Sequence, residues 1–209
     1  MAALVLCLGW ASVVGAADKP AAKDFTPLFN GQDLTGWKVN HGRKDVWDVE
    51  NGTLVVKGEG GGWLMTEGNY GDFELRLEYK VSTNGNSGVA LRAPLEGDPA
   101  YTGMEIQILD DPTYKGIRPA QHTGSIYDVV PPSQEATKPA GEWNRMDIKA
   151  RGRRITIALN GTVVVDANLD KYRDHAAKHP GLLRTTGHLG LQSHTNRVEF
   201  RNIEVKRLD

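Results

Sequence analysis

Cysteine is almost absent from this sequence. The 209 residues contain one, Cys7, and it lies in an N-terminal segment that we expect to be removed. The mature chain would then have no disulfide, no cysteine nucleophile and no zinc site built on thiolates. Its stability must come from a hydrophobic core, and with 39% apolar residues the sequence can form one.

The sequence also lacks a run of basic residues. Its 25 lysines and arginines are interleaved with 26 acidic residues, and the formal net charge is -1. Proteins that bind nucleic acid usually carry a basic patch or stripe. We therefore do not expect nucleic acid as a partner.

Long stretches with helical periodicity are missing too. Only residues 170–179 could form one or two helical turns, before Pro180 and Gly181 end them. The 24 glycines and 10 prolines instead indicate many turns. This composition is typical of an all-β protein with short strands.

The first 17 residues carry no charge and read as a signal peptide. Apolar residues are followed by small ones, which predicts cleavage after Ala16 or Ala17. Residues 18–24 would be a short tether and residues 25–209 a single domain. We expect a secreted or periplasmic protein with no stable membrane span after processing. A membrane anchor is the alternative, since the segment is at the short limit for a span.

Strict alternation over residues 73–81 predicts a half-buried strand. Phe73, Leu75 and Leu77 begin one face, while charged residues occupy the other. Asn-Gly pairs at 51–52 and 160–161 each separate two apolar runs and predict tight hairpins.

Further strands are expected at 89–92, 104–109, 143–150, 189–194 and 198–205. In the last of these, the apolar parity slips between Phe200 and Ile203, which predicts a β-bulge. About ten short strands in one domain favour a sandwich of two antiparallel sheets.

Three strands have unusual outward faces. Residues 88–92, 104–110 and 188–194 alternate core residues with small residues and a few hydrogen-bonding ones. Small residues beside a Glu, Gln, Arg or His make a floor with room above it. Sugar hydroxyls need such fixed planar donors and acceptors. Nearby aromatic residues could supply stacking faces, and they are Trp63, Tyr101, Tyr114 and Tyr127.

Seven segments carry a resemblance to a known family. They are residues 29–37 (FNGQDLTGW), 70–75 (YGDFEL), 86–92 (NSGVALR), 103–110 (GMEIQILD), 123–127 (TGSIY), 138–144 (KPAGEWN) and 187–194 (GHLGLQSH). Together, and in this order, they resemble the 3-keto-disaccharide hydrolase domain family.

The resemblance spans about residues 25–208. It implies a concanavalin A-like jelly-roll sandwich with one concave sheet. It also implies an enzyme, a glycoside hydrolase or lyase, acting on small or oligomeric sugars already oxidised to a ketone at C3.

A ketone at C3 acidifies the C2 hydrogen, so that proton removal can expel the group on C1 and water can then add. Such chemistry needs a base, an acid and groups that hold the enolate oxygen. We expect Glu105 and His194 to be the acid and base, in unassigned order. Arg92 and Gln107 would bind the keto oxygen and hydroxyls, and Gln192 would orient the ring. The remaining candidates for substrate binding are Tyr127, His122 and Asp110.

Other interpretations stay open. A conventional glycosidase would need two carboxylates, and only Glu105 has an outward position fixed by alternation; Asp110 and Asp111 follow at the strand end. No cofactor is demanded, but a divalent cation bound by Glu105, His194, His122 or Asp110 could polarise the ketone.

Two further interpretations involve no catalysis. The domain could be a non-catalytic carbohydrate-binding module of the same fold. Alternatively, His188, His194 and Arg92 could be structural groups bonded to loop backbone.

Overall fold

The computed structural model describes residues 24–208. The predicted signal peptide, residues 1–17, lies outside the described residues, as does all but the last residue of the 18–24 tether. Both assignments, and the expected export, therefore stay predictions. Within the described part of the chain, no helix is long and apolar enough to cross a bilayer.

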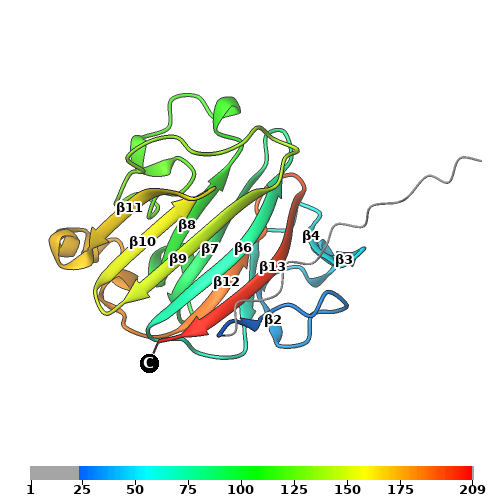
Figure 1. Ribbon diagram of the computed structural model, residues 1–209, viewed down its shortest axis with the longest axis horizontal. Coiled ribbons are helices and arrows are strands. Elements are labelled where there is room, and N and C mark those ends of the chain that lie inside the picture. The colour runs from blue at the N-terminus through cyan, green and yellow to red at the C-terminus, as the bar shows by residue number, and fades with distance from the viewer. Residues whose placement is uncertain (1–23, 209) are drawn as a thin grey trace, which may run out of the picture.

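The described residues form two antiparallel sheets that lie one in front of the other (Figure 1). The larger has the order β11-β10-β9-β6-β13-β4-β3, with β1 paired to β13 as its eighth strand. Its strands are β1 (Thr26–Pro27), β3 (Trp47–Glu50), β4 (Thr53–Val56), β6 (Phe73–Val81), β9 (Asn144–Arg151), β10 (Arg154–Leu159), β11 (Thr162–Asn168) and β13 (Val198–Arg207).

The smaller sheet has five strands in the order β2-β5-β12-β7-β8. They are β2 (Trp37–Gly42), β5 (Gly62–Thr66), β7 (Asn86–Ala93), β8 (Met104–Leu109) and β12 (His188–Gln192). The predicted all-β sandwich of two antiparallel sheets is confirmed.

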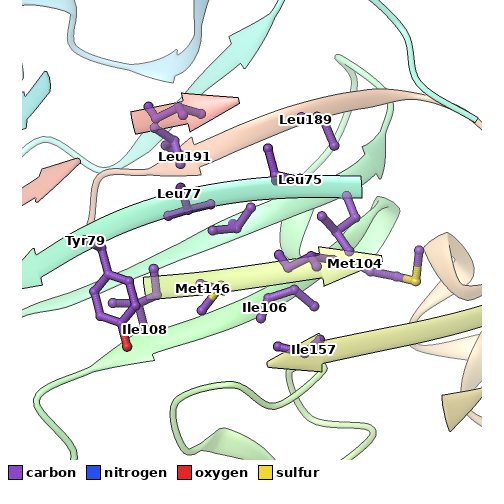
Figure 2. Close-up of a cluster of buried hydrophobic side chains, with 14 of the residues drawn as sticks. Leu75, Leu77, Tyr79, Met104, Ile106, Ile108, Met146, Ile157, Leu189 and Leu191 are labelled. Atoms are coloured by element: carbon purple, nitrogen blue, oxygen red, sulfur yellow. The ribbon is translucent and has the colours of Figure 1, made fainter. Parts of the chain in front are cut away.

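The core lies between the two sheets. β6 alternates buried and half-buried residues along its whole length, as its sequence pattern predicts. Figure 2 shows Leu75, Leu77 and Tyr79 of this strand near Ile106 and Ile108 of β8, and all five belong to one buried cluster. Each such side chain stabilises the fold by about 1.5–3 kcal/mol.

Both predicted hairpins are confirmed. Asn51 and Gly52 join β3 to β4 with φ values of 51° and 76°. Asn160 and Gly161 join β10 to β11 with φ values of 50° and 85°. Positive φ at both central residues is the requirement that favours Asn-Gly in a two-residue turn.

The predicted bulge in β13 is also present. The pairing of β13 with β6 shifts register between Arg201 and Glu204, and Asn202 has a φ of 51°. The extra residue explains why Phe200 and Ile203 are both buried although three positions separate them.

The helices are short. They are η1 (Lys44–Val46), α1 (Pro99–Thr102), η2 (Asp111–Thr113), η3 (Pro119–Gln121), η4 (Leu169–Ala177) and η5 (Pro180–Leu183). The helical turns expected at 170–179 correspond to η4. Helix α1 belongs to the connection between β7 and β8 and lies against both strands.

An irregular segment extends the five-stranded sheet beyond β8. The backbone N–H of Gln107 donates to Ser125 O at 3.2 Å, and Gly124 N–H donates to Gln107 O at 2.9 Å. Farther along, Tyr127 N–H donates to Glu105 O at 2.9 Å. These bonds place Tyr127 directly beside Glu105.

Candidate functional site

The outer face of the five-stranded sheet has a floor of small residues. The register of β7 and β8 pairs Ala90 with Glu105 and Gly88 with Gln107, so these four side-chain positions share one face. Gly190 of β12 pairs with Ala90 and continues the floor. The predicted combination of small and hydrogen-bonding residues is therefore present on this face.

The side chain of Glu105, on β8, extends over Gly88 of the neighbouring strand β7. A Cβ added to Gly88 would stand 2.1 Å from the Oε1 atom of Glu105, so only a glycine leaves room for the carboxyl group here. Glu105 is 3% exposed. Burial, together with the negative charge of nearby Asp98, raises the pKa of Glu105 to about 8. This carboxyl group is mostly protonated at neutral pH.

Glu105 lines a hollow of about 160 Å³. The hollow brings together five of the predicted site residues, which are Glu105, Gln107, Tyr127, Gln192 and His194. Its other lining residues are Asn86, Asp98, Ala100 and Tyr101.

A larger hollow of about 340 Å³ adjoins the first. Asp98, Gln192 and His194 line both hollows, so the two form one groove with a shared border. The remaining lining residues of the larger hollow are His41, Gly61, Gly62, Trp63, Gly97, Pro99 and Ser193. We call the two parts the small lobe and the large lobe.

Gln192 lines both lobes of the groove. Its Oε1 atom is enclosed and has no hydrogen-bond partner among the described residues. Its main chain is anchored, because Ser87 Oγ donates to Gln192 O at 2.7 Å. A buried acceptor without a partner is costly.

Aromatic rings form one wall of the small lobe. Tyr101 and Tyr127 contact each other edge to face, with ring centroids 6.4 Å apart. Gln121 Nε2 donates to the hydroxyl of Tyr127 at 3.3 Å. On its other side Tyr101 packs on His179, with ring centroids 5.1 Å apart. Both tyrosines are thus held in place by neighbours outside the lobe.

Asp98 is a site residue that our sequence analysis missed. It is exposed in the groove and caps helix α1, where its carboxylate accepts from Ala100 N–H at 3.0 Å. An Asp followed by Pro99 is a recognisable helix start. That signal could have predicted the helix, but not its position over Glu105.

Arg92 does not face the groove, and its predicted role in sugar binding is wrong. Its side chain is fully buried. It donates to Gly71 O at 2.9 Å and Gly152 O at 2.8 Å, and its Nη2 lies 3.1 Å from Asp72 Oδ1. The guanidinium thereby ties together two loops of the opposite sheet.

A bulge explains this reversal. The pairing of β7 with β12 shifts register between Ala90 and Ala93, and Arg92 has a φ of 51°. Ala93 therefore joins Ala90 in the apolar cluster on the outer face, and Arg92 points elsewhere. His188 is also structural, since its Nδ1 donates to Thr66 O at 2.8 Å. Arg92 and His188 are therefore structural groups bonded to backbone, as one of our interpretations expected. His194 differs from them, because it lines the groove.

Asp110 and His122 line neither lobe. The carboxylate of Asp110 accepts from Asn84 N–H at 3.0 Å, and His122 Nδ1 lies 3.1 Å from Asp111 Oδ1. Alternation ends with β8, and both side chains are bonded to loop residues, so their predicted place in the substrate site stays a prediction.

The four candidate metal ligands do not form one site. Glu105 and His194 line the groove, while Asp110 and His122 are bonded elsewhere. Within residues 24–208, no group of three or more His, Cys, Asp or Glu side chains is arranged to hold a metal ion. The residues present do not fit the cation that we considered.

Comparison with known proteins gives a consistent result. Residues 24–206 match the profile of a family described as the 3-keto-alpha-glucoside-1,2-lyase-like domain. The chain is 29% identical to the 3-keto-disaccharide hydrolase of Bacteroides thetaiotaomicron, over 90% of this chain and 80% of that protein.

Solved structures are similar as well. A crystal structure from Parabacteroides distasonis, of a candidate glycosyl hydrolase, is 30% identical with a TM-score of 0.79, covering 90% of this chain and 95% of that one. A carbohydrate-binding module from Bacillus subtilis has a TM-score of 0.58 at 14% identity, over 82% of this chain and 95% of that one. The second likeness concerns the fold alone.

Proposed function

The chain belongs to the family of 3-keto-alpha-glucoside-1,2-lyase-like domains, and we propose that it cleaves the glycosidic bond of 3-keto disaccharides. The name of the Bacteroides relative supports this substrate class. The observation that carries the proposal is that Glu105, with its raised pKa, and His194 line the same small lobe. Such perturbed groups in a cleft are typical of catalytic sites.

The proposed reaction begins at C2 of the oxidised ring. A base removes the C2 proton, and the electron pair is delocalised onto the C3 oxygen as an enolate. The C1–O bond then breaks, C1 and C2 become doubly bonded, and the leaving oxygen takes up a proton. Addition of water, with OH to C1 and H to C2, completes a net hydrolysis.

Glu105 is suited to hold the developing charge on the C3 oxygen. Because its pKa is raised to about 8 by burial, it carries a proton at neutral pH and can donate a hydrogen bond. A carboxylic acid kept neutral by an apolar site can stabilise an enolate in this way. Gln107, on the same strand two residues along, can add an amide contact to the sugar.

His194 is suited to be the base. It is exposed on the border of both lobes, next to the end of β12. From this position the imidazole would lie beside the small-lobe ring and the bond that joins it to the next unit. It would take the C2 proton and pass a proton to the leaving oxygen. Gln192 and Tyr127 would orient the ring.

A conventional glycosidase is the second candidate. Asp98 supplies the further carboxylate that such an enzyme needs, and its charge contributes to the raised pKa of Glu105. In that case Asp98→Asn would abolish cleavage of an ordinary disaccharide. Asparagine preserves the helix cap, so a loss of activity would not reflect an unfolded α1.

A binding module is less well supported. A groove that only binds sugar has no need for a buried carboxyl group with a raised pKa and a histidine that lines the same lobe. Gln107, Gln192 and Tyr127 suit both functions equally, and so they do not discriminate.

The deciding experiment offers the purified protein a 3-keto disaccharide and its unoxidised form, each with and without a chelator. We expect release of the second sugar from the keto substrate alone, at the same rate with chelator present. Cleavage of the unoxidised sugar would favour the conventional glycosidase. Affinity without turnover of either would favour the binding module.

A further inference from the structure

The large lobe has a rim made mostly of main chain. Strands β2 and β5 shift register between Asn40 and Gly42, next to the glycines at the start of β5. A Cβ on Gly62 would stand 2.0 Å from His41 O, and one on Gly42 would stand 2.0 Å from Gly61 O. The two backbones thus approach closely at the rim, in a way that only glycine permits.

Gly61 borders open space on this rim. It has a φ of +60°, and apart from its two chain neighbours no atom of the described residues lies within 4 Å of the position that its Cβ would occupy. His41, also with positive φ, is exposed beside it. The rim therefore presents backbone groups and one imidazole to a space that no side chain of the described residues fills.

The border between the lobes gives the groove a direction. Asp98, Gln192 and His194 are the residues common to both lobes, whereas Glu105 lines only the small one. A ligand that occupies both lobes must cross this border. The bond between its two halves would then lie beside His194, with the half that reacts over Glu105.

We propose that the large lobe, bordered by His41, Gly61 and Trp63, is the binding site for the leaving sugar of a disaccharide, and that it selects disaccharides over simple glycosides. This inference rests on the proposed function for the identity of the reacting ring. The lobe, of about 340 Å³, has room for a second ring, and its lining combines polar groups with the apolar side chains of Trp63 and Pro99. Asp98 and His194, both exposed at the border, offer polar groups to a ligand that spans the two lobes.

The test is a variant that adds a side chain at Gly61, which lines the large lobe but not the small one. Gly61→Asn is suitable because asparagine tolerates the left-handed backbone conformation better than most residues. Gly116→Asn is the matched control. Gly116 has a φ of +73° and equally open surroundings, but it lines neither lobe.

Two substrates separate the lobes. One is a disaccharide of a 3-keto-α-glucosyl unit and glucose, and the other is methyl 3-keto-α-glucoside, which has no second ring. We expect Gly61→Asn to lower kcat/KM roughly tenfold or more for the disaccharide and less than about twofold for the methyl glycoside. Gly116→Asn should change neither. Equal losses on both substrates, or no loss on either, would overturn the inference.

A binding measurement keeps this inference apart from the proposed function. If the unmodified protein cleaves neither keto substrate, the proposed function fails. Calorimetric titration with glucose, the probe for the leaving sugar, would then decide about the lobe. Binding that is lost in Gly61→Asn and kept in Gly116→Asn supports the lobe, and binding that is absent from the unmodified protein or equal in both variants contradicts it.

Discussion

The carboxyl group of Glu105 lies over the Cα of Gly88, so close that a Cβ there would stand 2.1 Å from Oε1. The two residues are diagonal neighbours on adjacent strands, since Gly88 pairs with Gln107 and Glu105 pairs with Ala90. The glycine therefore decides where the acid lies in the small lobe.

Gly88→Ala should impair catalysis much more than folding. The added methyl would overlap Oε1, Cδ and Cγ of Glu105, so this side chain would have to change rotamer, and we expect a loss of about 1–2 kcal/mol in the free energy of unfolding. The carboxyl group would leave its position, and we expect kcat to fall roughly tenfold to a hundredfold. Steady-state kinetics and urea unfolding measure the two effects.

The matched control is Gly190→Ala on the same face. There the new Cβ would stand 2.3 Å from Met65 Sδ and not against an acid. A comparable loss of stability with kcat close to that of the unmodified protein is expected. If both variants lose activity equally, the Gly88 effect is one of general packing.

The pH profile of activity should depend on Glu105. Because burial raises its pKa to about 8, the proton needed for the C3 oxygen is lost above that pH, and kcat/KM should fall there. Glu105→Gln keeps a hydrogen-bond donor and should retain part of the activity, without this alkaline fall. Glu105→Ala should be the less active of the two. A Gln variant as inactive as the Ala variant would indicate that Glu105 transfers a proton.

The same residue should make stability pH-dependent. The folded pKa of about 8 is above the ordinary value of 4.5, so the folded state retains a proton that the unfolded state loses. Stability is then highest below about pH 4.5 and decreases as the pH rises to about 8, by about 3 kcal/mol at pH 7. Glu105→Gln removes this effect.

Urea unfolding at pH 5 and pH 8 checks that expectation. The free energy of unfolding of Glu105→Gln, taken relative to that of the unmodified protein, should be about 3 kcal/mol higher at pH 8 than at pH 5. Glu74→Gln is the control, because Glu74 is paired with Lys149 on the outer surface of the other sheet. A pH-independent difference for Glu105→Gln would show that its carboxyl group is not shielded from water.

Arg92→Met should destabilise the protein without a specific effect on substrate binding. The buried guanidinium bonds two backbone carbonyl oxygens and Asp72, and its removal leaves these acceptors unsatisfied. We expect a loss of about 3–5 kcal/mol, with an unchanged KM for the folded fraction. Arg76→Met, on the surface beside Asp147, should cost less than about 1 kcal/mol. A raised KM at normal stability would restore Arg92 to the sugar site.

The sequence predicted those features that depend on local pattern. Alternation gave the burial of β6, and the Asn-Gly pairs predicted two hairpins whose φ values are positive as required. The same alternation placed Glu105 and Gln107 on the outer face, where β8 is regular. It failed at Arg92, because a bulge reverses the parity within three residues.

Other parts of the site depend on contacts that a linear pattern does not contain. Asp98 reaches the groove only because the β7–β8 connection folds back over the sheet. The large lobe arises from the close approach of two glycine-containing segments about twenty residues apart, at Gly42 and Gly62. Asp110 and His122 come after the end of the regular strand β8, where loop hydrogen bonds set the direction of the side chains.

The most direct test of the central claim is deuterium incorporation at C2. The protein would cleave a 3-keto disaccharide in D₂O, and NMR would follow C2 of the released keto sugar, with free keto sugar and the Glu105→Ala variant as the control for spontaneous exchange. Proton removal at C2 followed by addition of water predicts deuterium at C2 in each turnover, above the control. Product that forms at the normal rate with hydrogen retained at C2 would contradict the elimination and indicate direct displacement at C1.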